Sequence, residues 1–329
     1  MNPELIYIKP DRKCISDNNV FDDCFLPDQT LPKTIDSKVS HALPTSDKLY
    51  SNFIQAAYID NVLSSEECQK LRNAIDNNSD LSFWSTAGRE NEEARAFRNA
   101  DTIELQSSMI ANIIWNRVKD SFPFVDINIG NDEMDGNGIV DPRWERELPG
   151  TWKAVNLNSD FLFAKYPSGG SFAPHTDGRT IHNFNHRSFY SVIIFLNSID
   201  DGLGGGTKFY EKEAVTKLIR SELENQWTAD QSFLTAEVLP REGRMLIFDQ
   251  DLVHEGVPPI ECNQKYIIRS DIMFQRTPAV CDSQIDKEAY NIFRLAEDLA
   301  EQGKIEESLP LFRKAFKLSK NLAVMMGQA

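Results

Sequence analysis

YPSGGSFAPHTDG, residues 166–178, is the stretch that decides how the chain folds. It begins at the end of the apolar segment FLFAKY (161–166), turns over two glycines and enters a second extended segment, FAPH (172–175). In an extended chain, residues i and i+2 point to the same side. We therefore expect His175 and Asp177 to present one nitrogen and one carboxylate oxygen on the same side of a strand end.

The segments that follow continue as short strands separated by turns. Runs of β-branched and aromatic residues alternate with glycine or proline, which predicts an antiparallel β-domain. The expected fold class is mainly β with a helical buttress, a double-stranded β-helix of the jelly-roll or cupin-like type. Its core is expected at about residues 155–276, within a domain spanning residues 51–278. The runs are SFYSVIIFLN (188–197), GGGTKFY (204–210), EVLP (237–240), GRMLIFD (243–249) and KYIIRSDIMF (265–274).

The residues ahead of these strands have two different characters. Residues 1–50 hold five of the fifteen prolines and no glycine, which predicts a partly ordered N-terminal arm. From Ser64 the pattern is helical, because Ser64 and Glu67 form a capping box and apolar residues then recur on one face up to Ile75. A second helical stripe runs from Leu105 to Val118. Both helices are expected to pack beside the strands.

The C-terminal residues 283–325 carry two amphipathic helical stripes joined at Gly303. The pattern resembles a single tetratricopeptide repeat, although Ser308 replaces the usual alanine and Pro310 stands early in the second helix. One repeat cannot bury its own apolar face. The hairpin is therefore expected to pack on its own β-domain, with self-association or a protein partner as alternatives. The resemblance is carried by Leu295, Ala296, Leu299, Gly303, Phe312 and Ala315.

A third metal-ligating residue is needed beside His175 and Asp177, because a His-x-Asp pair alone is more often a turn or a satisfied polar pair. His254 follows the strand GRMLIFD and lies 77 residues beyond Asp177. In an antiparallel sandwich, a strand that distant in sequence can return beside the first. Two imidazoles and one carboxylate leave coordination positions open, as in non-haem Fe(II) oxygenases. His175, Asp177 and His254 are thus predicted to be both the metal ligands and the catalytic centre.

The segments around these three residues resemble the dioxygenase domain of the prolyl 4-hydroxylase type. The likeness includes residues 166–178, the block EVLPREGRMLIFDQDLVHEGVPP (237–259) and the final strand KYIIRSDIMF, and it covers roughly residues 52–276. It implies Fe(II) as the metal, 2-oxoglutarate as the co-substrate and O₂ as the oxidant. Ascorbate is a candidate auxiliary cofactor on the same ground.

The C5 carboxylate of 2-oxoglutarate requires a buried cation. In this family a basic residue on the strand after the distal histidine supplies it, and Lys265 and Arg269 stand eleven and fifteen residues beyond His254. They project to the same strand face because they differ by four positions. Lys265 is favoured, since a basic residue followed by an aromatic resembles the family's anchor position. Arg269 stays open as the rival, because its planar fork matches a carboxylate.

Other positions near the predicted pocket are informative in different ways. Tyr166, which precedes a proline, resembles the family tyrosine that lines the co-substrate pocket. Phe195 departs from the family, because many relatives have a tyrosine there. Arg179, His182 and His186 follow the metal strand in a stretch read as irregular. They are interpreted as surface residues, with a substrate-contacting loop as the alternative.

The composition and the net charge limit the classes of partner that this protein can have. The chain has 35 basic and 50 acidic residues, a net charge of −15, which repels polyanions and argues against nucleic acid as a substrate. No apolar run approaches the roughly 20 residues of a membrane span, and no apolar signal core opens the sequence. A cytoplasmic protein without membrane contact is expected. The five cysteines are scattered, odd in number and never in a CxxC pair, so free thiols are expected.

The predicted activity is hydroxylation of an unactivated C–H bond with release of succinate and CO₂. The family resemblance makes a prolyl residue of a protein the leading substrate, and a free amino acid or other small molecule is the alternative. A rival of another class is a catalytically inactive scaffold that keeps the dioxygenase fold and binds partners through its hairpin. The intact set of His175, Asp177 and His254 argues against this scaffold.

Overall fold

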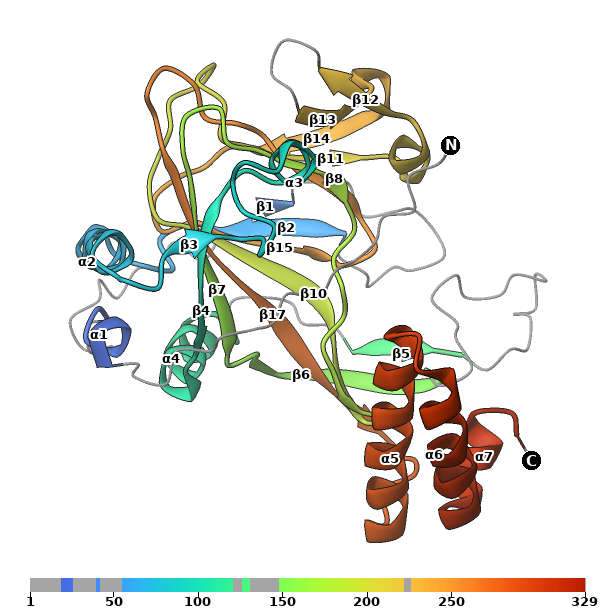
Figure 1. Ribbon diagram of the computed structural model, residues 1–329. Coiled ribbons are helices and arrows are strands. Elements are labelled where there is room, and N and C mark those ends of the chain that lie inside the picture. Colours follow the sequence, from blue (N-terminus) through green and yellow to red (C-terminus); the bar gives the residue numbers. More distant parts are fainter. Residues whose placement is uncertain are drawn as a thin grey trace. The chain divides into compact units, whose positions relative to one another are not determined.

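The computed structural model describes residues 19–25, 40–41, 55–120, 126–130, 148–221 and 226–328 (Figure 1). Most of the expected N-terminal arm, residues 1–50, lies outside these ranges. The chain divides into two compact units. The first comprises Met1–Pro123, Asn156–Gly178 and Phe189–Ile272, and the second comprises Phe124–Val155, Arg179–Ser188 and Met273–Ala329.

The first unit is built on a sheet of antiparallel strands. Its strand order is β1-β2-β15-β10-β17-β7-β4-β3. The register of β17 on β7 sets Lys265 opposite Tyr166. Both β10 and β17 also have residues in the second unit. The bounds are β1 Ser40–His41, β2 Ala56–Ile59, β15 Met245–Asp249, β10 His186–Phe195, β17 Lys265–Thr277, β7 Asp160–Tyr166, β4 Asp101–Gln106 and β3 Ser82–Phe83.

A smaller sheet in the same unit has the order β14-β11-β16-β8. Its strands are β14 Leu234–Val238, β11 Thr207–Tyr210, β16 Val253–Gly256 and β8 Phe172–His175. A separate hairpin pairs β12 Leu218–Ser221 with β13 Gln226–Ala229. Residues from both sheets share one apolar core, as expected when two sheets pack face to face. The mainly β, jelly-roll class predicted from the sequence is therefore confirmed. Core residues include Ala164, Tyr166, Phe195 and Phe248 from the larger sheet and Phe209 and Val238 from the smaller.

Strand β10 shows why an unbroken apolar run forms a strand here. From its second residue to its last, every side chain of HRSFYSVIIF is buried. A strand covered on both faces carries apolar residues at successive positions instead of alternating with polar ones. The polar or charged exceptions within this run are Arg187, which is 3% exposed, and Ser188 and Ser191, which are completely buried. Buried hydroxyls require partners, and the partner of Ser191 belongs to the candidate site.

The helical buttress begins with α2, Ser65–Asp76, and the predicted capping box of Ser64 and Glu67 is confirmed. The Glu67 carboxylate also pairs with Arg117 of α4, Ser108–Val118, at 2.8 Å, and both side chains are buried. Arg117 donates a further hydrogen bond to the carbonyl of Val62. This ion pair joins residues of two different helices that are 50 positions apart in sequence. Breaking such a pair on one side leaves an uncompensated buried charge.

Two details of the helices differ from expectation. The second helix starts later than predicted, because Leu105 belongs to β4 and the side chain of Ser107 accepts the hydrogen bond that caps α4. Two short helices, α1 Asn19–Asp22 and α3 Glu92–Phe97, were not predicted. In α1, Phe21 is buried against Phe163 with ring centroids 4.6 Å apart. The described part of the N-terminal segment thus packs on the first unit.

The second unit consists of three separate segments, the last of which contains the C-terminal helices. Its strands are β5 Ile127–Ile129, paired with β6 Gly150–Leu157, and β9 Ile181–Asn183, paired with the start of β10. Helices α5 Gln284–Glu301, α6 Ile305–Leu318 and α7 Lys320–Met325 follow one another (Figure 1). Phe184, beside β9, packs on Tyr290 of α5 with ring centroids 4.6 Å apart. The other members of this core are Ala289, Phe293, Ala315 and Leu322.

Helices α5 and α6 form the predicted hairpin, with α7 as an unpredicted addition. Ala296, Ser308 and Ala315 are almost completely buried, as small residues at a close helix contact should be. Pro310 is accommodated inside α6. By contrast, Leu295 is 51% exposed. The hairpin is present, and its assignment as a tetratricopeptide repeat stays a prediction.

Two predictions about the whole chain are addressed by the described residues. No helix among them combines the length and apolar character needed to cross a membrane. The four cysteines among them, Cys24, Cys68, Cys262 and Cys281, are all free thiols, as expected. Burial is the main cause that raises the pKa of Cys68 to about 12, which makes it an unreactive part of the core.

Candidate active site

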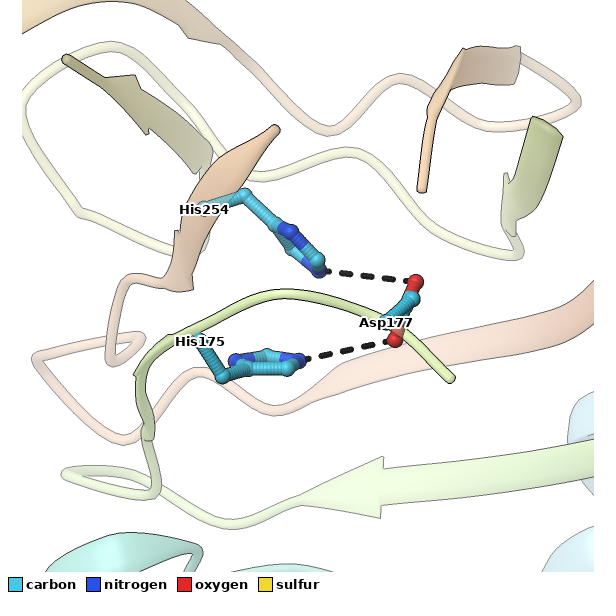
Figure 2. A group of neighbouring side chains, drawn as sticks. All are labelled: His175, Asp177 and His254. Carbon is cyan, nitrogen blue, oxygen red and sulfur yellow. Dashed lines mark ion pairs between the residues drawn. The ribbon is translucent and has the colours of Figure 1, made fainter. Parts of the chain in front are cut away.

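Strands β8 and β16 of the smaller sheet bring the two histidines together. They pair antiparallel with His254 directly opposite His175, and opposite residues on antiparallel strands share one face. The two imidazole ring centroids lie 4.2 Å apart. Asp177 follows β8, and its backbone N–H donates to the carbonyl of Gln250. This hydrogen bond holds the turn that places the carboxylate against both imidazoles (Figure 2).

The three side chains form a compact set of donor atoms. Nε2 of His175 lies 3.7 Å from Oδ1 of Asp177, and Nε2 of His254 lies 3.7 Å from Oδ2. All three ligand atoms lie within 4.8 Å of one another. Figure 2 shows the carboxylate facing the Nε2 edge of each ring. Within the described ranges, this is the one group of three or more His, Cys, Asp or Glu residues with such an arrangement.

Both imidazoles are oriented by their own backbone. Nδ1 of His175 lies 2.7 Å from the carbonyl of Ala173, and Nδ1 of His254 lies 3.0 Å from that of Leu252. A carbonyl oxygen only accepts hydrogen bonds, so each Nδ1 carries the proton. Each Nε2 therefore presents its lone pair toward Asp177. This is the tautomer that a metal-binding histidine requires, fixed by a partner of the opposite ring nitrogen.

The protonation states also suit a metal. Burial acts to raise the pKa of Asp177, but Arg269 and the two histidines outweigh it and hold that pKa well below its usual range. Burial, followed by the neighbouring His175, lowers the pKa of His254 to about 4. Near pH 7, Asp177 is thus a carboxylate and His254 a neutral imidazole. Metal binding needs both groups in these forms.

Asp177 is held by a network that the sequence did not reveal. Ser191 Oγ donates to its Oδ2 at 2.6 Å, and Nη2 of Arg269 lies 3.1 Å from its Oδ1. The same guanidinium nitrogen lies 3.6 Å from Oδ1 of Asp271, which accepts a hydrogen bond from Gln250. Arg269, one of the two predicted anchor residues, is therefore part of the carboxylate network around the candidate metal ligands.

Lys265, the other predicted anchor, has very different surroundings. Its side chain is 2% exposed, and Nζ lies 4.8 Å from the centre of the Tyr166 ring. Its polar contacts are long hydrogen bonds to the carbonyls of Gly206 and Val257, at 3.5 and 3.4 Å. In the part of the chain that the structure describes, no carboxylate forms an ion pair with it. Burial is the main cause that lowers its pKa to about 7.

A pocket connects the His–Asp–His cluster with Lys265. Tyr166 borders it, as predicted, and Phe195 gives it an apolar wall in place of a phenol. All six predicted site residues lie on this pocket, so the structure brings every one of them together. The lining residues are Tyr166, Phe172, His175, Asp177, Ile193, Phe195, Thr207, His254, Gly256, Lys265, Ile267 and Arg269.

Two contributors to the site were missed, for different reasons. A serine inside the apolar run of β10 was a signal for Ser191, because a buried hydroxyl needs a partner. Phe172 gave no signal, since an aromatic residue in a strand is usually core. Its ring stacks on the imidazole of His175 with centroids 3.7 Å apart and planes at 20°.

The two remaining histidines of the post-metal segment lie together in the second unit. The stretch read as irregular is ordered, because β9 pairs with the beginning of β10. His182 and His186 stack with ring centroids 5.0 Å apart. Burial, followed by the charge of His182, lowers the pKa of His186. Neither residue belongs to the His–Asp–His cluster.

Residues 161–270 match the family model of the 2OG-Fe(II) oxygenase superfamily. This range contains all six predicted site residues. The chain therefore carries an oxygenase domain of this superfamily, which uses Fe(II) and 2-oxoglutarate, and the enzyme class expected from the sequence is confirmed. No curated protein matches the sequence.

Several solved structures are similar to this chain at low identity. The viral collagen prolyl hydroxylase of Paramecium Bursaria Chlorella virus-1 is 14% identical, with 67% of this chain and 96% of that chain covered and a TM-score of 0.38. A Trichoplax adhaerens prolyl hydroxylase in complex with a hypoxia inducible factor peptide is 15% identical, with coverages of 69% and 85% and a TM-score of 0.40. HygX from Streptomyces hygroscopicus is 11% identical, with coverages of 70% and 85% and a TM-score of 0.40. Because these values are low, the assignment rests on the family match.

Proposed function

We propose that this chain is a hydroxylase in which His175, Asp177 and His254 hold Fe(II) and Lys265 binds the C5 carboxylate of 2-oxoglutarate. The observation that carries the proposal is the position of Lys265. A buried ammonium without a carboxylate partner is costly, and this one lies on the same pocket as three metal-binding side chains. An anion that reaches both the metal and the lysine resolves that cost.

The residues fit the metal and the keto acid. Two nitrogens and one oxygen leave three positions of an octahedron open, which suits a chelating keto acid and O₂. Gly256 leaves room beside the lysine, because a Cβ at this position would lie 3.2 Å from Cβ of Phe172 and 3.6 Å from Nζ of Lys265. When bound, Fe(II) and 2-oxoglutarate activate O₂ so that a C–H bond is hydroxylated and succinate and CO₂ are released.

Each side chain has a separate task in this scheme. The backbone carbonyls of Ala173 and Leu252 orient the imidazoles. Ser191 and Arg269 each bind one oxygen of Asp177, which keeps the carboxylate oriented. Arg269 is thereby a positioning residue for Asp177, and the anchor role goes to Lys265. Tyr166 and Phe195 exclude water from the ammonium and strengthen its attraction to a carboxylate.

The substrate supplies an unactivated C–H bond, and two substrate classes are candidates, of which the first is a prolyl residue of a protein. The likeness of the sequence to the prolyl 4-hydroxylase type supports it. A free amino acid or another small molecule is the second candidate, and the Arg98 guanidinium over the Phe172 ring favours it. An inactive scaffold is disfavoured, because nothing in the geometry of the three donor side chains is impaired.

Anaerobic addition of Fe(II) and 2-oxoglutarate to the purified protein tests the proposal. A keto acid chelated to Fe(II) gives a visible metal-to-ligand charge-transfer band. We expect this band, and on admission of air we expect stoichiometric succinate. A protein that stays colourless and forms no succinate would be a scaffold.

A further inference from the structure

Arg98 lies at the C-terminal end of α3 and is tied to the strand that carries His175. Its backbone forms an isolated antiparallel bridge with Phe172, the first residue of β8. Its carbonyl accepts a hydrogen bond from the indole nitrogen of Trp84. These two contacts hold the Arg98 backbone in place, and the side chain therefore starts from a fixed point beside β8.

The Arg98 guanidinium is one aromatic ring away from a candidate metal ligand. Its Cζ lies 4.7 Å from the centre of the Phe172 ring, and that ring stacks on the imidazole of His175 at 3.7 Å. Phe97 contacts the same ring edge-on, with centroids 5.4 Å apart. Because Phe172 lines the pocket, a charge resting on Phe172 acts on whatever enters beside it.

The guanidinium has no anionic partner within the described ranges. The side chain is half-buried, its Nε is buried without a hydrogen-bond partner, and no described carboxylate pairs with it. Two acids close to it in sequence are already paired, since Glu93 binds Arg220 and Asp101 binds Arg89. Leaving a buried donor unpaired costs its desolvation, so such groups call for an explanation. A ligand that accepts from Arg98 supplies one.

Lys265 lines the pocket, and Arg98 lies beside it, in contact with the lining residue Phe172. Burial is the main cause of the lowered pKa of Lys265, with Glu255 and Glu237 opposing it, and the charge of Arg98 lowers it further. 2-Oxoglutarate has two carboxylates, and the proposed function assigns one to the metal and the other to Lys265. That assignment leaves the Arg98 guanidinium available to a third anionic group.

We propose that Arg98 binds a carboxylate of the primary substrate, so that the enzyme hydroxylates a small carboxylic acid of the amino-acid class. This inference rests on the proposed function and adds the substrate class to it. One guanidinium over an aromatic face suits one carboxylate, because its planar fork binds two oxygens at once. A polyanionic substrate is disfavoured by the net charge of −15.

Chemical protection of Arg98 tests the proposal without catalysis. The protein is loaded with Zn(II) in place of Fe(II) and with 2-oxoglutarate, then treated with phenylglyoxal, and modification of Arg98 is followed by mass spectrometry. The probes are the proteinogenic L-amino acids and the matching amino-acid amides, which differ only in the loss of the carboxylate. We expect at least one acid to slow modification of Arg98 and its amide to leave the rate unchanged. Protection by no acid, or equal protection by acid and amide, overturns the proposal.

Substitution of Arg98 separates this role from co-substrate binding. Arg98→Gln should weaken the protecting acid about 10- to 100-fold, the range of one charge-assisted contact. Arg98→Lys should recover part of the loss. Arg89→Gln is the matched control, because Arg89 also lies over an aromatic ring, that of Phe83, but is paired with Asp101. It should bind the acid as the unmodified protein does.

Affinity for 2-oxoglutarate is measured for the same variants by the charge-transfer band. Unchanged affinity in Arg98→Gln, with thermal unfolding like that of the unmodified protein, supports a substrate role. A loss of 2-oxoglutarate affinity as large as that of Lys265→Ala would assign Arg98 to the co-substrate and overturn the proposal. If the unmodified protein gives no band, the proposed function fails, and that result is distinct from the protection of Arg98.

Discussion

The two ends of the pocket on β17 carry the same charge in opposite surroundings. At one end, the Arg269 guanidinium lies 3.1 Å from the Asp177 carboxylate and 3.6 Å from that of Asp271. At the other end, the Lys265 ammonium rests on the Tyr166 ring and two backbone carbonyls. A cation that the protein has already neutralised has a task within the protein. A buried cation that it has not neutralised is available to a ligand.

The choice of residue at each end follows from this difference. Arginine stays protonated in proteins, so it belongs where carboxylates surround it permanently. Lysine can lose its proton when buried, and the pKa of Lys265 is lowered to about 7. The lysine end therefore tolerates the absence of a ligand by giving up its charge. An arginine at position 265 would stay charged in the same apolar surroundings.

The largest expected effect comes from removing a metal ligand. His175→Ala, Asp177→Ala and His254→Ala should each abolish succinate formation and weaken Fe(II) binding, because each removes one of only three donors. Circular dichroism should show that the fold is retained. Fe(II) affinity is measured under anaerobic conditions by competition with a chromophoric chelator.

Two other histidines provide matched controls for that test. His182→Ala and His186→Ala remove imidazoles that stack on each other and do not belong to the donor cluster. Both variants should keep Fe(II) affinity and turnover. Near-normal succinate formation in any two of the three ligand variants would refute the assignment of the site.

The contrast between the two cations predicts the next largest effect. Lys265→Ala should raise the KM for 2-oxoglutarate far more than Arg269→Ala, because losing the partner of a buried charge costs about 3–5 kcal/mol, or roughly two to four orders of magnitude. Arg269→Ala should instead weaken Fe(II) binding by about 10- to 100-fold, the usual consequence of removing a residue that orients a ligand. Steady-state kinetics and metal titration measure the two effects separately.

A lysine on the neighbouring strand controls for loss of charge alone. Lys165 of β7 pairs with Asp76 at 2.6 Å and is partly exposed. Lys165→Ala should leave the KM for 2-oxoglutarate unchanged. If Arg269→Ala raised that KM more than Lys265→Ala did, the anchor role would pass to Arg269.

The candidate site was predictable to the extent that it follows from strand geometry. His175 and Asp177 follow from the two-residue period, and His254 from the return of a later strand. Lys265 was favoured over Arg269 only through the family resemblance, because both project to one face. The different surroundings of the two cations come from other strands and were not predictable. The contact of Arg98 with Phe172 joins residues 74 positions apart and leaves no periodic signal.

The fold was likewise predictable where the sequence signal is local and not predictable elsewhere. Capping residues identified the start of α2, since the Ser64–Glu67 pair is local. Leu105 was assigned to the wrong element, because a short strand followed at once by a helix gives an apolar spacing compatible with either. The short helix α3, which carries Arg98 at its end, has too few residues for a periodic pattern.

Raising the pH should have a smaller effect on the affinity for 2-oxoglutarate. The C5 carboxylate needs a protonated Lys265, whereas the pKa of about 7 leaves the lysine of the ligand-free protein mostly neutral at higher pH. Binding must then take up a proton, so affinity for 2-oxoglutarate should fall by up to about tenfold per pH unit above 7. Three neighbouring charges also act on this pKa. Glu255 and Glu237 raise it, and Arg98 lowers it.

Calorimetry of the Zn(II)-loaded protein in two buffers of different ionisation enthalpy measures the proton uptake directly. Lys265→Gln removes the titrating group and should bind 2-oxoglutarate weakly at every pH, without uptake. Equal proton uptake in Lys265→Gln and the unmodified protein would show that another group titrates.

The smallest effect on the pocket is expected from the C-terminal hairpin. Phe293 of α5 is 5% exposed and belongs to a core formed with Phe184, Tyr290 and α6. Phe293→Ala should lower the free energy of unfolding by about 3–5 kcal/mol, because a large buried ring is replaced by a cavity. Leu295→Ala on the same helix removes a side chain that is 51% exposed and should change it by no more than about 0.5 kcal/mol. Thermal and denaturant unfolding measure both changes.

Because none of the residues in this core lines the pocket, the folded fraction of either variant should give the full charge-transfer band with unchanged affinity for 2-oxoglutarate. A Phe293→Ala protein that stays folded but loses the band would make the hairpin part of the active site.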